Sequence, residues 1–128
     1  MTNHRIPKII CVDDDNDLLN TVADILERKF EAAITRANSV REALEKLDSE
    51  GPFDIVVSDF QMPPENGDYL HRTLRARGHE ALFVLYSSYD GVKPADFEDE
   101  FFLGHIQKPE AKSLIALVGK GLALVGKK

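Results

Sequence analysis

The stretch Asp54–Gly67, DIVVSDFQMPPENG, decides how this chain folds. Apart from Asp54, residues Phe53–Ser58 are apolar or small on both faces, which is typical of a strand at the centre of a parallel sheet. The following residues, Asp59–Gly67, contain two strong turn signals, Met62-Pro63-Pro64 and Asn66-Gly67. The stretch therefore predicts a buried central strand that ends at an aspartate in a loop.

Three more apolar runs end in the same way, with a polar side chain at the carboxyl end. They are Lys8–Val12 before Asp13-Asp14, Ala81–Tyr86 before Ser87, and His105–Gln107 before Lys108-Pro109. If the runs are neighbouring parallel strands, these side chains meet Asp59 at one edge of the sheet, where open α/β sheets bind ligands. Three crowded carboxylates repel one another and need a proton or a cation. Mg²⁺ fits because its ligands are oxygens.

Between the strands lie segments with helical periodicity. We expect helices from the Asp15 cap to Lys29, from Asn38 or Ser39 to Gly51, over 68–77, from Pro94 onward, and over 110–125, and a weaker strand over 33–37. The first helix presents an apolar stripe that includes Leu18, and His71 on the third helix is interpreted as a surface residue. Because such alternation favours right-handed parallel crossovers, the predicted fold class is α/β, a five-stranded parallel sheet with helices on both faces.

Length and charge narrow the class of protein. Residues 1–128 suffice for a single domain, and the net charge of −6 argues against direct binding of nucleic acid. The lone cysteine, Cys11, cannot form an internal disulfide, which favours a reducing compartment. The start, MTNHRIPK, lacks the apolar core of a signal peptide, and no apolar run is long enough to span a bilayer. We expect a cytoplasmic protein without a membrane segment.

Taken in order, the motifs resemble the receiver domain of two-component response regulators over essentially the whole chain. The matching pieces are CVDDD at 11–15, VVSDFQMPPENG at 56–67, LYSS at 85–88 and QKP at 107–109. The separations are 45 residues from Asp14 to Asp59, 28 from Asp59 to Ser87 and 21 from Ser87 to Lys108, the last two slightly short for the family. The resemblance implies the flavodoxin-like, doubly wound fold with strand order 2-1-3-4-5.

By the resemblance, Asp59 accepts a phosphoryl group from a histidine kinase or a histidine phosphotransfer protein. Asp13, Asp14, Asp59 and the main-chain carbonyl of Gln61 would bind Mg²⁺, with Mn²⁺ as a possible substitute. Lys108 and Ser87 would contact phosphoryl oxygens. The chain would then be a signalling protein that assists its own phosphorylation and dephosphorylation, and not an enzyme.

The resemblance also implies tuning and output features. A cis peptide bond is expected between Lys108 and Pro109, and His105 occupies the position of a rotating switch residue. Gln61 and Tyr89 flank the route of hydrolytic water, and the bulk of Tyr89 predicts slow dephosphorylation. A surface of the fourth helix, fifth strand and fifth helix, about 90–125, would change its affinity for an unknown downstream protein. The chain would be a monomer or a phosphorylation-dependent dimer, and either a stand-alone receiver or a piece of a larger regulator.

Two other functions remain open at this point. A receiver-shaped interaction module that is never phosphorylated would fit the departures at His105 and Tyr89. A haloacid dehalogenase-type phosphohydrolase would use Asp13 as its nucleophile, although it has no role for the VVSDFQMPPENG motif.

Overall fold

The computed structural model describes residues 5–126, so the first four residues of MTNHRIPK lie outside the described part. In that part, five parallel strands form one sheet in the order β2-β1-β3-β4-β5. Their bounds are β1 Lys8–Val12, β2 Ala33–Ala37, β3 Ile55–Ser58, β4 Leu82–Ser87 and β5 Phe102–Gln107. The predicted fold class and strand order are confirmed.

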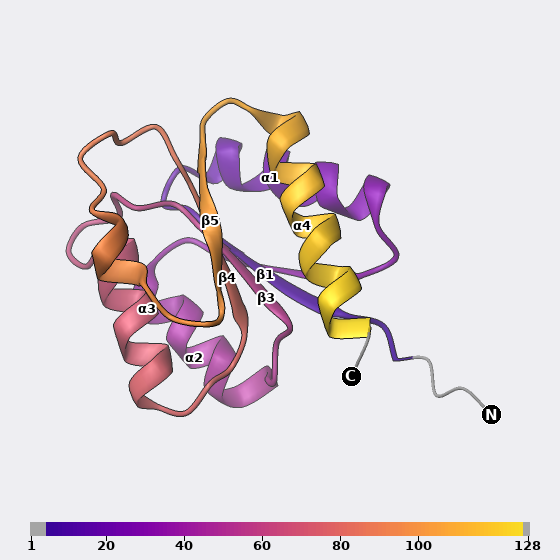
Figure 1. The fold of residues 1–128 in the computed structure, drawn as a ribbon, viewed down its shortest axis with the longest axis horizontal. Coiled ribbons are helices and arrows are strands. Elements are labelled where there is room, and N and C mark those ends of the chain that lie inside the picture. Colours follow the sequence, from indigo (N-terminus) through magenta and orange to yellow (C-terminus); the bar gives the residue numbers. More distant parts are fainter. Residues whose placement is uncertain (1–4, 127–128) are drawn as a thin grey trace.

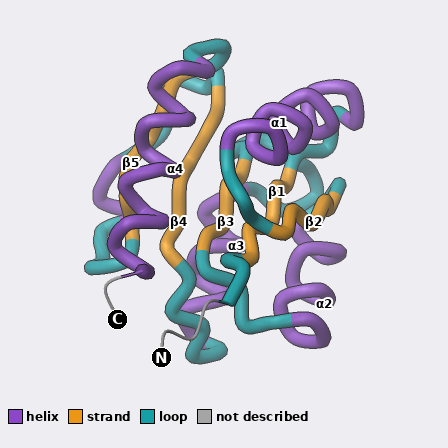
Figure 2. The backbone as a smooth tube through the Cα atoms, turned by 90° about the vertical axis from the view of Figure 1, so that its right-hand side faces the viewer, coloured by secondary structure: helices purple, strands orange, loops and turns teal. Residues whose placement is uncertain are grey.

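Helices cover both faces of this sheet, and the strands run through the middle of the molecule (Figures 1 and 2). The helices are α1 Asn16–Lys29, α2 Val40–Glu50, α3 Gly67–Ala76 and α4 Ala111–Gly126. Side chains of α1 and α4 share one core cluster with alternate residues of the central strands, and side chains of α2 and α3 share another. Within the described chain, no helix is long and apolar enough to cross a bilayer.

Local sequence signals explain where the helices begin. The Asp15 carboxylate accepts hydrogen bonds from the main-chain N–H groups of Asp17 and Leu18, and the Ser39 hydroxyl accepts one from Glu42. Both caps satisfy donors that have no partner inside the helix. Leu18 itself is 42% exposed, so its predicted place in the buried stripe is wrong. It lies in the first turn of α1, whose buried residues begin at Leu19.

The connection between β4 and β5 departs from the prediction. Of the described residues, those between these strands form one 3₁₀ turn, η1 Pro94–Phe97, instead of the helix expected to begin at Pro94. The turn ends because Glu98 has an extended backbone, and the Asp99 carboxylate then accepts the N–H of Phe101. The surface predicted from a fourth helix, fifth strand and fifth helix is therefore built from η1, β5 and α4.

His71 is buried, which corrects its interpretation as a surface residue. It is 5% exposed and packs against Phe97, and its Nε2 atom lies 2.9 Å from Oδ2 of Asp99. The same oxygen accepts a hydrogen bond from Nε of Arg75 at 2.7 Å. Burial lowers the pKa of His71, although the charge of Asp99 opposes this effect. This contact network ties the segment before β5 to α3.

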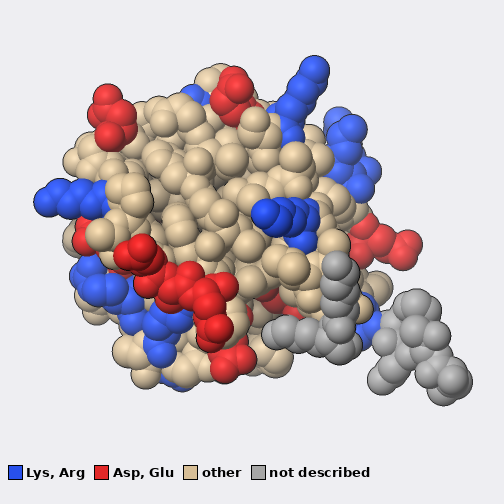
Figure 3. Space-filling model, viewed as in Figure 1, with Lys and Arg blue, Asp and Glu red and all other residues tan. Residues whose placement is uncertain are grey.

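Charged side chains are unevenly distributed around β5. On the face seen in Figure 3, acidic side chains gather over the segment from η1 to β5, whereas basic side chains lie over α4. Asp96, Glu98 and Glu100 in that segment are exposed, and Phe101 to Leu103 are half-buried beside them. Apolar surface and negative charge thus adjoin each other at this edge of the sheet.

Candidate functional site

The strand order brings two acidic strand ends together. Val12, the last residue of β1, is the register partner of Ser58, the last residue of β3. The N–H of Asp59 donates to the carbonyl of Val12 at 2.9 Å, so Asp13 and Asp59 leave the sheet side by side. The first and third strands are neighbours, as the resemblance implied, and the site lies at the carboxyl edge of the sheet.

Three aspartates form a compact oxygen cluster at this edge. Asp13, Asp14 and Asp59 each place a carboxylate oxygen within 4.8 Å of the others. Asp13 is buried and 5% exposed, whereas Asp14 is open to solvent. Carboxylate oxygens of mixed burial suit Mg²⁺, which keeps some of its water when a protein binds it. The residues present therefore fit this cation.

Lys108 reaches into the same cluster from the end of β5. Its Nζ atom lies 2.7 Å from Oδ2 of Asp13 and 3.4 Å from Oδ2 of Asp59. Burial acts to lower the pKa of Lys108, but the hydrogen bond to Asp13 and the charge of Asp59 outweigh it and raise that pKa. The ammonium group therefore stays charged. The peptide bond between Lys108 and Pro109 is cis.

The pKa of Asp13 is raised, whereas an ion pair with a lysine ordinarily lowers the pKa of a carboxyl group. Burial raises the pKa of its carboxyl group, and the hydrogen bond from Lys108 offsets this only in part. Its Oδ1 atom also accepts the N–H of Asp15. The cluster thus holds more negative charge than one lysine neutralises, because Asp14 and Asp59 add two further carboxylates.

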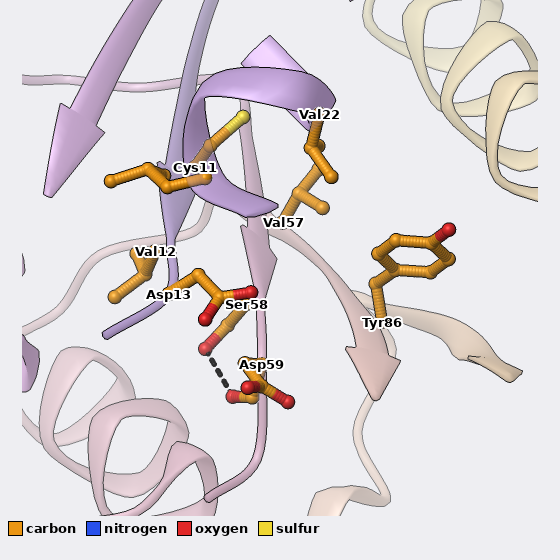
Figure 4. Close-up of a pocket in the computed structure, with 9 residues that line it drawn as sticks. Cys11, Val12, Asp13, Val22, Val57, Ser58, Asp59 and Tyr86 are labelled. Atoms are coloured by element: carbon orange, nitrogen blue, oxygen red, sulfur yellow. Dashed lines mark hydrogen bonds between the residues drawn. The ribbon is translucent and has the colours of Figure 1, made fainter. Parts of the chain in front are cut away.

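A small hollow of about 10 Å³ adjoins the acidic pair, roughly the room that one water needs. Figure 4 shows Asp13 and Asp59 at its polar end, with Cys11, Val22 and Val57 toward the apolar core. This hollow is therefore too small to hold a phosphoryl group.

The predicted hydroxyl, Ser87, ends the neighbouring strand β4. It is 1% exposed, and its Oγ atom accepts the N–H of Tyr89 at 3.1 Å. The half-buried His105 donates from Nε2 to the carbonyl of Ser87, also at 3.1 Å. The structure thus brings His105 into contact with the strand end that carries this hydroxyl.

Gln61 lies in the loop that follows Asp59, and its side chain is exposed. The Asn66 side chain holds this loop by accepting the N–H of Met62. The start of α3 approaches Asp59 so closely that a Cβ atom on Gly67 would lie 2.6 Å from the Asp59 carbonyl. This position therefore requires glycine.

Sequence reasoning missed three residues that shape the site. Phe60 donates its N–H to Oδ1 of Asp59 at 2.8 Å, and the Ser58 hydroxyl donates to the main-chain carbonyl of Asp59 (Figure 4). Tyr86 presents its ring to Nζ of Lys108, 5.8 Å from the ring centre. The two neighbours of Asp59 could have been suspected from adjacency alone, whereas Tyr86 depends on the pairing of β4 with β5.

Comparisons with known proteins agree with this geometry. The sequence matches the family described as Response regulator receiver domain over residues 9–118. The chain belongs to this family. Among curated proteins, none matches the sequence closely.

Solved structures described as receiver domains or response regulators have a similar fold. One is the signal receiver domain of an HD domain-containing protein from Pseudomonas fluorescens Pf-5, with a TM-score of 0.86 and 20% identity, covering 97% of this chain and 100% of that one. A CheY-like receiver domain protein from Methanospirillum hungatei JF-1 has a TM-score of 0.82 and 21% identity, with 96% and 98% covered. Response regulator TrrA from Thermotoga maritima, in complex with Mg²⁺-BeF, has a TM-score of 0.79 and 23% identity, and the match covers 91% of this chain and 99% of that one.

Membership in this family indicates the general function of the chain. Receiver domains are phosphoacceptor modules of two-component signalling and bind Mg²⁺ at an acidic pocket, and they are not enzymes in the usual sense. In this chain, Asp13, Asp14 and Asp59 form a cluster of acidic oxygens that could hold a metal ion.

Proposed function

We propose that this chain receives a phosphoryl group on Asp59 from a phosphohistidine, with Mg²⁺ bound by Asp13, Asp14, Asp59 and the main-chain carbonyl of Gln61. The observation that carries the proposal is the acidic cluster with Lys108 beside it, 2.7 Å from Asp13 and 3.4 Å from Asp59. Mn²⁺ would serve as a substitute cation, since it also prefers oxygen ligands.

In the proposed transfer, a carboxylate oxygen of Asp59 attacks phosphorus and forms a P–O bond. The P–N bond to the donor imidazole breaks, and its electron pair returns to the ring, which takes up a proton. The product is an acyl phosphate. Such transfers depend on positioning and on neutralising charge more than on bond making by the protein.

Each neighbouring residue has a part in this proposal. Mg²⁺, when bound, neutralises charge on the transferring oxygens. Lys108 supplies a second positive charge beside Asp59, and Ser87 offers its hydroxyl hydrogen to a phosphoryl oxygen, since its Oγ lone pair already accepts the N–H of Tyr89. Gln61 and Tyr89 would limit access of hydrolytic water to the acyl phosphate.

The output surface would be formed by η1, β5 and α4. Phosphorylation adds about −1.5 to −2 charge beside Asp59. His105 contacts the carbonyl of Ser87, so a movement of Ser87 toward the phosphoryl group would be felt in β5. A shift between two states of this surface would change its affinity for a downstream protein.

Several broader expectations remain parts of the proposal. The donor would be a histidine kinase or a histidine phosphotransfer protein, and residues 1–128 would act as a single receiver domain in the cytoplasm. The chain would bind neither nucleic acid nor membrane directly, and would be a monomer or a phosphorylation-dependent dimer.

Labelling with a small phosphodonor tests the proposal. The protein is incubated with Mg²⁺ and acetyl phosphate, and any acyl phosphate is located by mass spectrometry. We expect one label, on Asp59, that disappears when EDTA removes the metal. Asp59→Asn should abolish it, whereas Asp68→Asn, which changes an aspartate in the first turn of α3, should leave it unchanged.

The same experiment separates the alternatives. A label on Asp13 with continuing release of phosphate would support the phosphohydrolase. An unlabelled protein that also fails to respond to beryllofluoride would support the interaction module.

A further inference from the structure

Two main-chain N–H groups hold the two side chains that the proposed reaction brings together. Phe60 donates to Oδ1 of Asp59 at 2.8 Å, and Tyr89 donates to Oγ of Ser87 at 3.1 Å. Each donor lies one or two residues after the side chain that it holds. The orientation of each side chain therefore depends on the path of the loop that follows its strand.

The side chains of these two donors are stacked on each other. The rings of Phe60 and Tyr89 have centroids 4.9 Å apart and planes inclined by 16°. Both residues are half-buried, and Phe60 also meets the edge of the buried Phe97 ring at 6.3 Å. The stack therefore joins the loop after β3 to the loop after β4 and anchors both to the core beneath α3.

A third residue leaves room for the stack. Gly91 is exposed, and a Cβ atom built there would collide with the phenol ring of Tyr89. The colliding atoms belong to the end of a side chain, so an alanine would displace the ring without straining the backbone. Gly91 therefore offers a way to disturb the stack while both aromatic residues stay in place.

We propose that the Phe60–Tyr89 stack is a positioning element that sets the Ser87 hydroxyl relative to the Asp59 carboxylate. The inference rests on the proposed function and deepens it. Without the stack, the loops after β3 and β4 would move independently, and the hydroxyl would face the acceptor for a smaller fraction of the time. In this role Phe60 and Tyr89 act through Asp59 and Ser87, by way of their main-chain N–H groups.

Amide hydrogen exchange tests the geometric half of the inference, that the stack holds the loop after β4 in place, because this measurement needs no phosphorylation. Ser87→Ala removes the acceptor and should speed exchange of the Tyr89 N–H, which shows that the bond protects it. Phe60→Leu and Gly91→Ala should speed the same exchange by about 2- to 10-fold, the factor expected for loss of a stacked ring pair. Phe60→Tyr keeps a ring and should leave the rate unchanged. If Phe60→Leu leaves the Tyr89 amide as protected as before, the inference is overturned.

The initial rate of Asp59 phosphorylation by acetyl phosphate tests the functional half. Phe60→Leu should lower the maximal rate by about 2- to 10-fold with little change in the half-saturating donor concentration, by the same ring-pair factor. In the Ser87→Ala background, Phe60→Leu should have no further effect, because the stack acts through that hydroxyl. Equal slowing in both backgrounds would point to general damage and overturn the inference.

The two halves also distinguish this inference from the proposed function. If the wild-type protein takes up no phosphoryl group while Phe60→Leu still speeds exchange of the Tyr89 amide, the proposed function fails and the positioning contact stands. If phosphorylation occurs normally and is indifferent to Phe60→Leu, the proposed function stands and this inference fails.

Discussion

Replacing Lys108 by methionine should destabilise the protein in a way that a divalent cation repairs. The ammonium group lies 2.7 Å from Asp13 and 3.4 Å from Asp59, and its side chain is 13% exposed. At an effective dielectric constant of about 20, these attractions amount to about 6 and about 5 kcal/mol before desolvation is subtracted. Methionine fills a similar volume, so the variant isolates the charge.

The net loss is smaller than these attractions, because folding also takes the three charged groups out of most of their contact with water. Removing one partner of a buried ion pair costs about 3–5 kcal/mol. Since Lys108 and Asp59 keep some contact with solvent, we expect a loss of about 2–3 kcal/mol in the free energy of unfolding without Mg²⁺. The remaining carboxylates then repel each other without a counter-charge.

Urea unfolding in EDTA and at a series of Mg²⁺ concentrations measures this effect. A cation at 100 times its dissociation constant stabilises by about 2.7 kcal/mol, which would restore most of the loss. The Mg²⁺-dependent gain should be larger in Lys108→Met than in wild type, because the lysine no longer occupies the cluster. Lys112→Met, at an exposed lysine on α4, is the control and should change neither value. A loss below about 0.5 kcal/mol, or a loss that Mg²⁺ does not reduce, would refute the electrostatic reasoning.

Three further predictions concern other parts of the chain. Burial holds the pKa of His71 below 6.5, so as the pH falls this histidine is protonated in the unfolded chain before it is protonated in the folded one. The contribution of His71 to the free energy of unfolding should therefore be at its maximum above about pH 6.5 and fall toward pH 5 by up to about 1.4 kcal/mol per pH unit. The urea midpoints of His71→Gln should lack this dependence on pH. Burial raises the pKa of Cys11 to about 12, so iodoacetamide should alkylate it at pH 8 only after unfolding, and equal rates for native and unfolded protein would contradict the burial. The acyl phosphate of Tyr89→Ala should decay faster than that of wild type, measured by its lifetime after removal of the donor; a longer lifetime would count against shielding by this ring.

Much of the fold could be predicted because its signals are local. The apolar run before Asp59 and the caps Asp15 and Ser39 lie where the structure has a strand end and two helix starts. The parallel arrangement of the strands followed from the alternation of strands and helices, and the order of the strands followed from the resemblance. The lengths of strands were less predictable, and β5 begins at Phe102 instead of His105, since Phe102 already pairs with Phe83 of β4 ahead of a register shift.

The fourth connection could not be predicted because its helix competes with contacts that are distant in sequence. Pro94 and the acids after it favour a helix start, and η1 does begin there. The turn ends at Glu98, whose backbone is extended, and the Asp99 carboxylate that follows binds Arg75, 24 residues earlier, and the N–H of Phe101. The pattern of residues 90–103 does not indicate that Arg75 is the partner of Asp99. His71 was misjudged for the same reason, since its burial depends on Phe97 and Asp99 arriving from that connection.

The site was more predictable in composition than in detail. Asp13, Asp14, Asp59 and Lys108 lie together as the strand-end argument required. The stack of Phe60 on Tyr89 had no sequence signal, because it depends on two loops meeting above the sheet.

The link between Asp99 and α3 also matters for the local stability of the segment between β4 and β5. Every other pair of consecutive strands is joined through an α-helix, whose main-chain hydrogen bonds persist whatever its surface side chains are. Between β4 and β5, side-chain contacts take the place of a helix, among them those of the Asp99 carboxylate and of the buried Phe97 ring. A segment with few internal main-chain bonds opens locally at a low free-energy cost. Substitution of Asp99 alone should therefore loosen the segment between β4 and β5, while the acidic cluster and the sheet beneath it stay intact.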